Sequence, residues 1–299
     1  MSVPQTILPI FLLIILGYVL ARRGALDPHA NKALGGLAFK LFMPMVLFTG
    51  MVNAPLHNGL NIRNLVAYFV PALIIFAVVN FFTHRSLKHP TPFGLTASFS
   101  NNVLIGLAMV AGLYGDAGLV LLFTVLAVHS LMLFSFQSLY SCLTSSEPFK
   151  PSVLLASLAN PMIIGLLLGT AVNLAGIGLP DWSMKLATWL AQAALPCALI
   201  VLGANLSGYK LRPDGYVVAV TVAKLAVMPL LVLLACLLLE IDGMPRAILV
   251  LMAANPSGIN VLGFSRSLQD TQRTSSAICL TTLLSMATLP LWIWINGLI

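Results

Sequence analysis

The sequence predicts an all-α integral membrane protein, and three observations lead to that prediction. Of its 299 residues, 59% are hydrophobic and only 8% are charged, whereas about 25% of residues are charged in a typical soluble domain. Apolar runs of roughly the 20 residues that cross a bilayer recur along the chain. Lysine and arginine collect in alternate links between these runs, as in multi-pass proteins. These features exclude a soluble enzyme, a nucleic-acid-binding protein and a disordered chain.

Ten apolar runs are long enough to cross a lipid bilayer, and we expect each to be a transmembrane helix. The first follows a start without Lys or Arg, so it lacks the basic region of a cleaved signal peptide. All links are too short to hold a soluble domain. The ten expected spans are residues 5–21, 33–52, 65–83, 93–113, 118–142, 152–174, 183–206, 215–239, 245–264 and 275–297.

The distribution of positive charge predicts the orientation of these spans. If the N-terminus is outside, the cytoplasmic links contain ten cations, and the opposite links contain only Arg63 and Arg246. This asymmetry predicts that both termini lie outside the inner or plasma membrane of the cell. The ten cytoplasmic cations are Arg22, Arg23, Lys32, Arg85, Lys88, Lys150, Lys210, Arg212, Arg266 and Arg273.

Similar motifs in the two halves of the chain indicate an internal repeat. Residues 41–47 around Pro44 in the second span resemble residues 193–199 around Pro196 in the seventh, and the third and eighth spans carry Pro71 and Pro229. A five-span unit used twice, over residues 1–149 and 150–299, explains both matches. Because the unit has an odd number of spans, the second copy is inverted, a frequent plan of secondary transporters.

The acidic residues exclude several kinds of membrane site. All eight lie in links or at span ends, so the membrane core offers no carboxylate for a sodium or proton site. No Walker motif and no His or acidic cluster is present. The four cysteines lie in or beside apolar runs and form no CxxC pair. We therefore expect no enzymatic activity, no metal and no cofactor.

Polar residues interrupt the fourth and ninth spans at their middle. Such breaks expose backbone groups that lipid does not tolerate but a polar cavity does. The N-termini of half-helices carry partial positive charge, which suits an anion. An alternative is that these residues only hold packed helices together. The candidate binding residues are Asn101, Asn102, Gly106, Asn255, Pro256, Ser257, Gly258 and Asn260.

Three further polar residues lie well inside expected spans. Lys224 lies about nine residues into the eighth span, roughly 13 Å deep. Its ammonium would either attract an anionic substrate, replace a bound cation, or snorkel to the cytoplasmic edge. His129, beside Ser130 in the fifth span, would relay protons, contact substrate or bond to a neighbouring helix.

The four tryptophans, Trp182, Trp189, Trp292 and Trp294, fit interfacial anchors.

At these residues the sequence resembles the auxin efflux carrier family, which includes plant PIN auxin transporters and bacterial permeases for malonate, malate and related acids. The most specific matches are residues 100–102 with Gly106, and residues 255–258. Residues 224–229 and 290–292 resemble the bacterial malonate-permease branch. Family members usually carry a proline near Ala108, so the break in the fourth span is expected to depend on the two asparagines and Gly106.

The resemblance implies a fold and a mechanism. The fold would be two inverted five-helix repeats, similar to bile-acid symporters and sodium/proton antiporters, with the broken fourth and ninth helices crossing at the substrate site. A scaffold (residues 1–64 and 150–210) would form a homodimer, and a transport domain (65–149 and 211–299) would move by an elevator mechanism. The expected activity is permeation of small mono- or dicarboxylates such as malonate or malate.

Two other functions remain open from the sequence. A sodium-coupled symporter of the bile-acid type shares the expected fold, and a membrane ligand sensor would bind without transport. The co-substrate would be a proton or sodium, or transport would need none. The lipid bilayer is an expected partner, and nucleic acid is not.

Overall fold

The computed structural model describes residues 3–52, 54, 61–144 and 160–299, and this part of the chain is almost entirely helical. The first helices are α1 (Val3–Arg22), α2 (Pro28–Leu37), α3 (Met43–Val52), α4 (Ile62–Leu87), α5 (Phe93–Ser98) and α6 (Leu107–Thr144). They are followed by α8 (Pro161–Leu174), α9 (Asp181–Gly208), α10 (Gly215–Val222), α11 (Met228–Leu238), α12 (Gly243–Ala254) and α13 (Leu268–Gly297). Short π-helical segments are η1 (Ala38–Phe42), η3 (Asn102–Gly106) and η4 (Ala223–Val227), and η5 (Ile259–Phe264) is a 3₁₀-helix.

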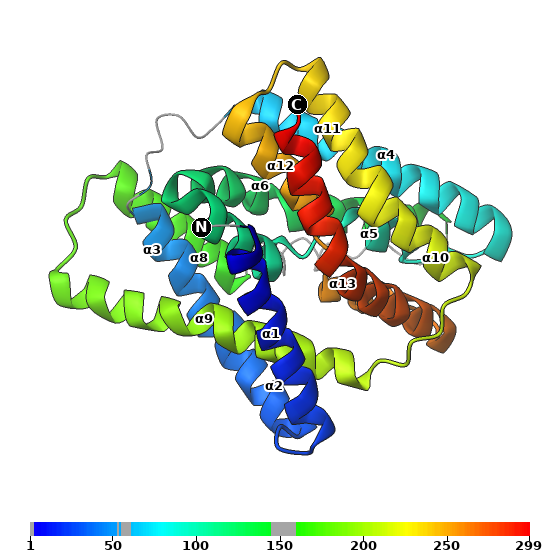
Figure 1. Cartoon of the computed structure of the whole chain (residues 1–299), viewed down its shortest axis with the longest axis horizontal. Helices are drawn as coiled ribbons and strands as arrows, with labels where there is room; N and C mark the ends of the chain where they lie inside the picture. The colour runs from blue at the N-terminus through cyan, green and yellow to red at the C-terminus, as the bar shows by residue number, and fades with distance from the viewer. Residues whose placement is uncertain (1–2, 53, 55–60, 145–159) are drawn as a thin grey trace. The chain divides into compact units, whose positions relative to one another are not determined.

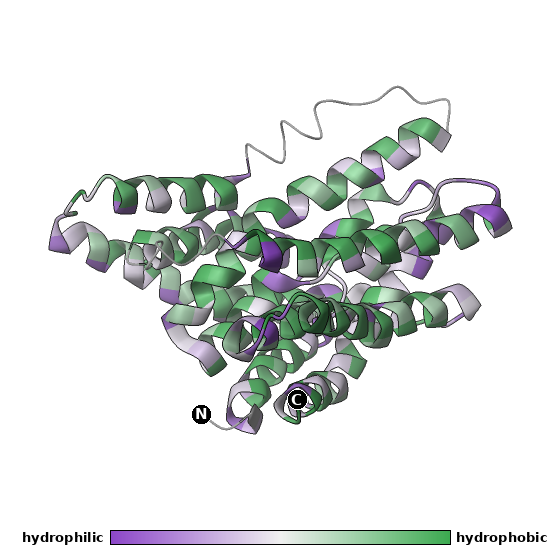
Figure 2. Ribbon diagram, turned by 90° about the horizontal axis from the view of Figure 1, so that it is seen from above, coloured by the Kyte–Doolittle hydropathy of each residue, from purple (hydrophilic) through white to green (hydrophobic). Residues whose placement is uncertain are grey.

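The surfaces of these helices are those of a membrane protein. Hydrophobic residues cover most of each helix, and hydrophilic residues lie mainly at helix ends and in links (Figure 2). Large apolar side chains such as Leu12, Phe81, Phe82 and Leu167 are more than half exposed. A soluble monomer rarely exposes so much apolar surface, whereas lipid contact stabilises it. The expectation of an all-helical, multi-pass membrane protein is confirmed.

Seven segments among the described residues are long and apolar enough to cross a membrane, fewer than the ten expected spans. One of them, Asn102–Thr144, has 43 residues, about 65 Å of helix and twice the thickness of the hydrocarbon core. It kinks at Gly115, whose φ of 60° favours glycine, between the expected fourth and fifth spans. Helix α12 is short because it ends at a break. The expected residues 152–159 of the sixth span, with Lys150, lie outside the described residues.

The chain divides into two compact units. The first contains residues 1–60, 107–127 and 156–208. In it α1 crosses α9 closely (Figure 1), because Gly17 and Gly203 present no side chain where the two backbones meet. Asn173 of α8 donates from its amide to the carbonyls of Met51, Val52 and Ala54 at the end of α3.

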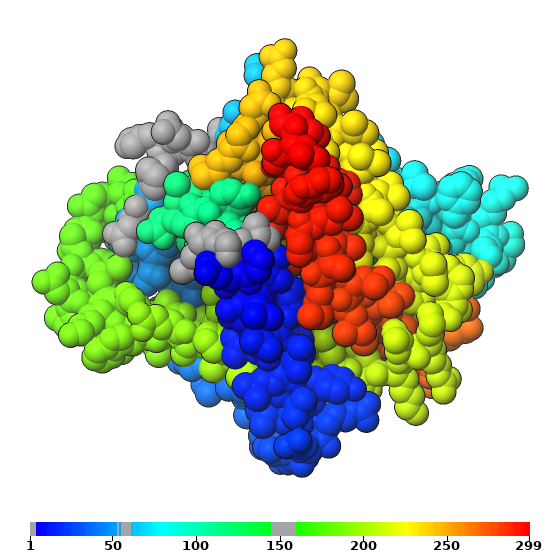
Figure 3. All heavy atoms as spheres, viewed as in Figure 1, coloured from blue at the N-terminus to red at the C-terminus, as the bar shows by residue number. Residues whose placement is uncertain are grey.

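The second unit contains residues 61–106, 128–155 and 209–299. Helix α4 packs on α5 and α11. Helix α13 packs on α10 and α12 and lies at the face seen in Figures 1 and 3. All the polar residues singled out in the fourth, eighth and ninth spans belong to this unit, as do His129 and Ser130.

Candidate functional site

The fourth span is broken at Phe99–Asn101. Helix α5 ends at Ser98, and the Thr96 and Ser98 hydroxyls donate to the backbone carbonyls four residues before them. Phe99 is extended, with φ −87° and ψ 109°, and the chain becomes helical again at Asn102. The break therefore includes Asn101, the first asparagine of the pair, and forms without a proline at position 108.

The ninth span is broken at Asn255–Gly258. Asn255 takes an extended conformation, with φ −59° and ψ 147°, because the following Pro256 disfavours the helical region for the residue before it. Pro256 also has no N–H to donate to the helix. Gly258 is extended as well, and the 3₁₀ segment η5 begins at Ile259.

The two broken segments cross each other as a short antiparallel pair. Ser100 and Ser257 face each other in an isolated β-bridge. The Asn101 N–H donates to the Pro256 carbonyl at 2.8 Å, and the Gly258 N–H donates to the Phe99 carbonyl at 3.1 Å. A Cβ on Gly258 would lie 2.7 Å from the Phe99 ring, so this position requires glycine for close approach. The crossing thus pairs backbone groups that neither helix satisfies.

A continuous network of side-chain hydrogen bonds surrounds the crossing. Asn255 Nδ2 donates to Asn102 Oδ1 at 2.8 Å, and Asn102 Nδ2 donates to the Tyr68 hydroxyl at 2.9 Å. Tyr68 donates to Ser100 Oγ at 3.2 Å, and Lys224 Nζ donates to the same oxygen at 2.8 Å. All five side chains are buried. The network therefore joins both breaks to α4 and η4.

Lys224 does not snorkel in this structure. Its side chain is fully buried, and its Nζ also donates to the Ala253 carbonyl at 2.6 Å. It lies in the π-helical turn η4, which is followed by Pro229. Because Pro229 has no N–H for the Leu225 carbonyl, Trp292 Nε1 donates to that oxygen at 2.8 Å.

The expectation that Trp292 is an interfacial anchor is therefore wrong. Its indole is 8% exposed, and its N–H bonds to the protein interior. The interpretation still fits Trp182, Trp189 and Trp294, which are all more than half exposed.

Two amide atoms at the crossing have no hydrogen-bond partner. Asn101 Nδ2 and Asn255 Oδ1 are buried and unpaired. A buried polar atom without a partner is costly, and such atoms occur where a ligand completes the bonding. The starts of η3 and η5 add the partial positive charge of a helix N-terminus. The crossing can therefore donate hydrogen bonds to a small anion.

The remaining predicted residues differ in their burial and in their contact with this network. Ser257 is buried, and its Oγ donates to the Thr96 carbonyl at 2.7 Å. His129 is buried, with Nε2 3.4 Å from the Tyr68 hydroxyl and its ring centroid 4.4 Å from that of Phe99. Ser130 is half-buried, and Asn260 is exposed and outside the network.

Sequence reasoning missed Tyr68 and Ser100 as members of the network, together with Thr281, whose Oγ accepts from the Ser257 N–H at 3.2 Å. A tyrosine hydroxyl three residues before Pro71, in an otherwise apolar span, is the signal that could have found Tyr68.

Among the residues that the structure describes, no cluster of three His, Cys, Asp or Glu could hold a metal ion.

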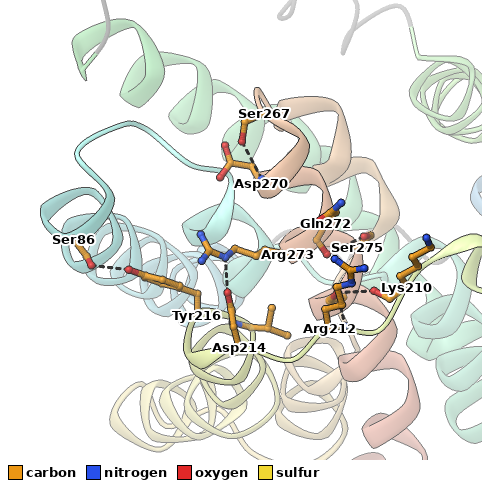
Figure 4. A network of polar contacts seen from close by, with 12 residues as sticks. Ser86, Lys210, Arg212, Asp214, Tyr216, Ser267, Asp270, Gln272, Arg273 and Ser275 are labelled. Carbon is orange, nitrogen blue, oxygen red and sulfur yellow. Dashed lines mark hydrogen bonds and ion pairs between the residues drawn. The ribbon is translucent and has the colours of Figure 1, made fainter.

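A second polar cluster lies where α10 and α13 begin (Figure 4). Arg273 pairs with Asp214 through Nε, and its guanidinium lies 4.5 Å from the centroid of the Tyr216 ring. Burial raises the pKa of the Asp214 carboxyl, but the Val217 N–H and the Arg273 guanidinium lower it further, so the net pKa lies below its usual value. Ser276 Oγ bonds the carbonyl of Lys210 and the N–H of Arg212.

This second cluster borders a cavity of about 200 Å³. Its hydrogen bonds and its ion pair hold the link between α9 and α10 on α13. We therefore regard the cluster as a structural contact of the second unit rather than as part of the crossing.

Comparisons with known proteins place these features in a family. A family model described as "Membrane transport protein" matches residues 2–147 and 137–293, nearly the whole chain. An "Uncharacterized transporter" of Methanothermobacter thermautotrophicus is 28% identical over 302 residues, covering 98% of each chain. A "Putative malonate transporter" of Rhizobium meliloti is 28% identical over 306 residues, covering 94% of this chain and 92% of the relative. The "Uncharacterized transporter YfdV" of Escherichia coli is 22% identical, covering 98% and 97%.

Proposed function

The chain belongs to the membrane transport protein family, that of the auxin efflux carriers, and from this membership we propose that it is a permease for small organic anions. The expectations of a transporter rather than an enzyme, and of this family, are confirmed. The proposed substrates are mono- or dicarboxylates such as malonate or malate. The observation that carries the proposal is the unpaired, buried Asn101 amide donor beside two helix starts at the crossing.

Electrostatics at the crossing support an anion over a cation as the cargo. The side-chain bonds around it involve amides, hydroxyls and the Lys224 ammonium, with no carboxylate among the described partners. Helix starts carry partial positive charge, and Asn101 Nδ2 adds a neutral donor. A carboxylate that accepts these bonds would satisfy donors that are otherwise buried at a cost.

The substrate class is supported by a relative. The Rhizobium meliloti protein, whose printed name is a malonate transporter, covers nearly the same length as this chain. Malonate and malate are small enough to be held by one or two asparagines and the first turns of two helices. We therefore propose dicarboxylates of this size as the first substrates to test.

The proposed mechanism is an elevator, with ten transmembrane helices in two inverted repeats. The compact units support it, because the first contains much of the proposed scaffold (1–64 and 150–210) and the second much of the proposed transport domain (65–149 and 211–299). The same number of residues separates Pro71 from Pro229 and Asn102 from Asn260, which supports a repeat of the third and fourth spans. A homodimer through the scaffold, and both termini outside the cell membrane, belong to the same proposal.

The test is uptake of labelled malonate and malate into proteoliposomes, with and without a pH gradient, at fixed membrane potential. Asn101→Ala removes the unpaired donor, and Asn101→Asp replaces it with a negative charge. A hydrogen bond to a charged group contributes about 1.5–3 kcal/mol, so we expect uptake to fall about 10-fold or more in both variants. Asn296→Ala, in the last turn of α13, is the matched control and should transport normally.

The outcomes separate the competing functions. Uptake that rises with an inward proton gradient makes the proton a co-substrate, and uptake without gradient dependence indicates uniport or exchange. Binding without counterflow would indicate a ligand sensor. Normal uptake by Asn101→Ala would place the substrate elsewhere, and no uptake of either acid by folded protein would contradict the proposed substrate class.

A further inference from the structure

The Lys224 ammonium donates hydrogen bonds to two oxygen atoms at the crossing. Its Nζ lies 2.6 Å from the Ala253 carbonyl and 2.8 Å from Ser100 Oγ, and the side chain is fully buried. Ala253 lies in the last turn of α12, directly before the break. Both partners are therefore oxygens, one of them a backbone carbonyl at a helix C-terminus.

The end of a helix attracts positive charge. The last carbonyls carry a partial negative charge equivalent to about half an elementary charge, and within a membrane no water compensates for it. In secondary transporters with broken helices, C-terminal ends of half-helices and unwound carbonyls coordinate the coupling sodium ion. Here a covalently attached cation lies at such an end.

We propose that Lys224 is a resident cation of the crossing, occupying the place of a coupling ion, so that transport requires neither sodium nor another metal cation. Two of the three ammonium donors are directed to protein oxygens. Through Ser100 and Tyr68 the ammonium is connected to Asn102, which follows the break in the fourth span. Lys224 is therefore a positioning residue that holds the two breaks together. The uptake part of its test rests on the proposed permease function.

The decisive variants are Lys224→Ala and Lys224→Met. Alanine removes the stem and leaves room for a free cation beside the Ala253 carbonyl and Ser100, whereas methionine removes the charge but keeps most of the volume. Lys40→Ala is the matched control, because Lys40 also lies in a π-helical turn, η1, but is exposed. Each protein is studied in sodium, potassium and choline salts of equal ionic strength, with ethylammonium as the replacement cation.

The first measurement is the unfolding temperature in detergent, which needs no substrate. We expect the wild type and Lys40→Ala to show the same temperature in all salts. Lys224→Ala should unfold about 5 °C lower in choline, and sodium or ethylammonium should restore part of the loss. Lys224→Met should also be destabilised, but no cation should restore it, because the space is filled.

The second measurement is malonate uptake at fixed pH and membrane potential. The wild-type rate should be the same in the three salts, and Lys224→Ala should lose at least 10-fold in choline and regain activity with sodium or ethylammonium. Sodium-stimulated uptake by the wild type, normal uptake by Lys224→Met, or failure of both cations to restore Lys224→Ala would each overturn the proposal. If the wild type transports no malonate, the proposed function fails, and the unfolding temperatures still decide the role of Lys224.

Discussion

Gly106 gives the most direct test of the crossing, because its lack of a side chain makes room for an asparagine pair. A Cβ at this position would lie 2.8 Å from Asn255 Nδ2 and 3.0 Å from Asn102 Oδ1, the two atoms that bond to each other. The first distance is shorter than carbon contacts allow, the second is tighter than most of them, and Asn102 Cβ lies 3.3 Å away. Gly106→Ala should therefore push the two amides apart and break their hydrogen bond.

The expected cost follows from two opposing effects. Leaving a buried donor and acceptor unpaired costs about 1–3 kcal/mol, while replacing glycine by alanine within a helix gains about 1 kcal/mol. The control is Gly36→Ala in α2, where an added Cβ would meet no atom within 4 Å. Gly36→Ala should show only the stability gained by placing alanine in a helix. The free energies of unfolding of the two variants should therefore differ by about 1–3 kcal/mol, or roughly 5 °C in unfolding temperature.

Thermal unfolding in detergent and malonate uptake measure the two consequences. We expect Gly106→Ala to lose most of its uptake, because the donors near Asn101 move with the network, while Gly36→Ala transports normally. In an Asn255→Ala background the nearest of these atoms is absent, so the stability cost of Gly106→Ala should shrink. Equal unfolding temperatures for Gly106→Ala and Gly36→Ala, or an undiminished cost in the double variant, would refute the reasoning.

Two further predictions concern contacts away from the asparagine pair. Trp292→Phe leaves the Leu225 carbonyl unpaired and should lower stability by about 1–3 kcal/mol, whereas Trp294→Phe, at an exposed position, should unfold like the wild type. Burial raises the pKa of Asp214, but hydrogen bonds from the backbone and from Arg273 lower it by more, so the net pKa is below its usual value. The charged carboxylate therefore stabilises the folded protein at pH values above the pKa that Asp214 has in the unfolded chain. The unfolding temperature of the wild type should therefore fall below about pH 4. Asp214→Asn, which keeps the helix cap, should reduce that fall; an unchanged pH profile would contradict the role of the Arg273 pair.

Much of the helical architecture follows from the sequence because the membrane imposes strong length and polarity rules. The expected third span, 65–83, lies within α4, and the expected seventh, 183–206, lies within α9. Their ends extend a few residues further because caps such as Asn61 lie in the polar links. The rules fail where a helix is interrupted. Apolarity alone does not reveal the π-helical turn η4 or the continuation of α6 through Gly115.

The candidate site was predicted in its parts but not in its connections. Asn101, Asn102 and Asn255 stood out because amides are rare in the middle of apolar spans, and Lys224 because a buried charge is costly. Their partners could not be deduced, since the bonds join residues far apart in the chain. Tyr68 looked like an ordinary aromatic residue of a membrane helix, although its hydroxyl is the centre of the network.

The backbone carbonyls at the two breaks accept hydrogen bonds from different donors, and this difference bears on how the crossing works. The Thr96 carbonyl, at the end of α5, accepts a bond from the neutral Ser257 hydroxyl, whereas the Ala253 carbonyl, at the end of α12, accepts one from the Lys224 ammonium. Two helix C-termini that meet at one place would repel each other without a positive charge between them. Ser100 belongs to the first break and also bonds to Lys224, so a single ammonium acts on both. If Lys224 is the resident cation proposed above, the crossing can receive an anion at its helix starts without first recruiting a cation.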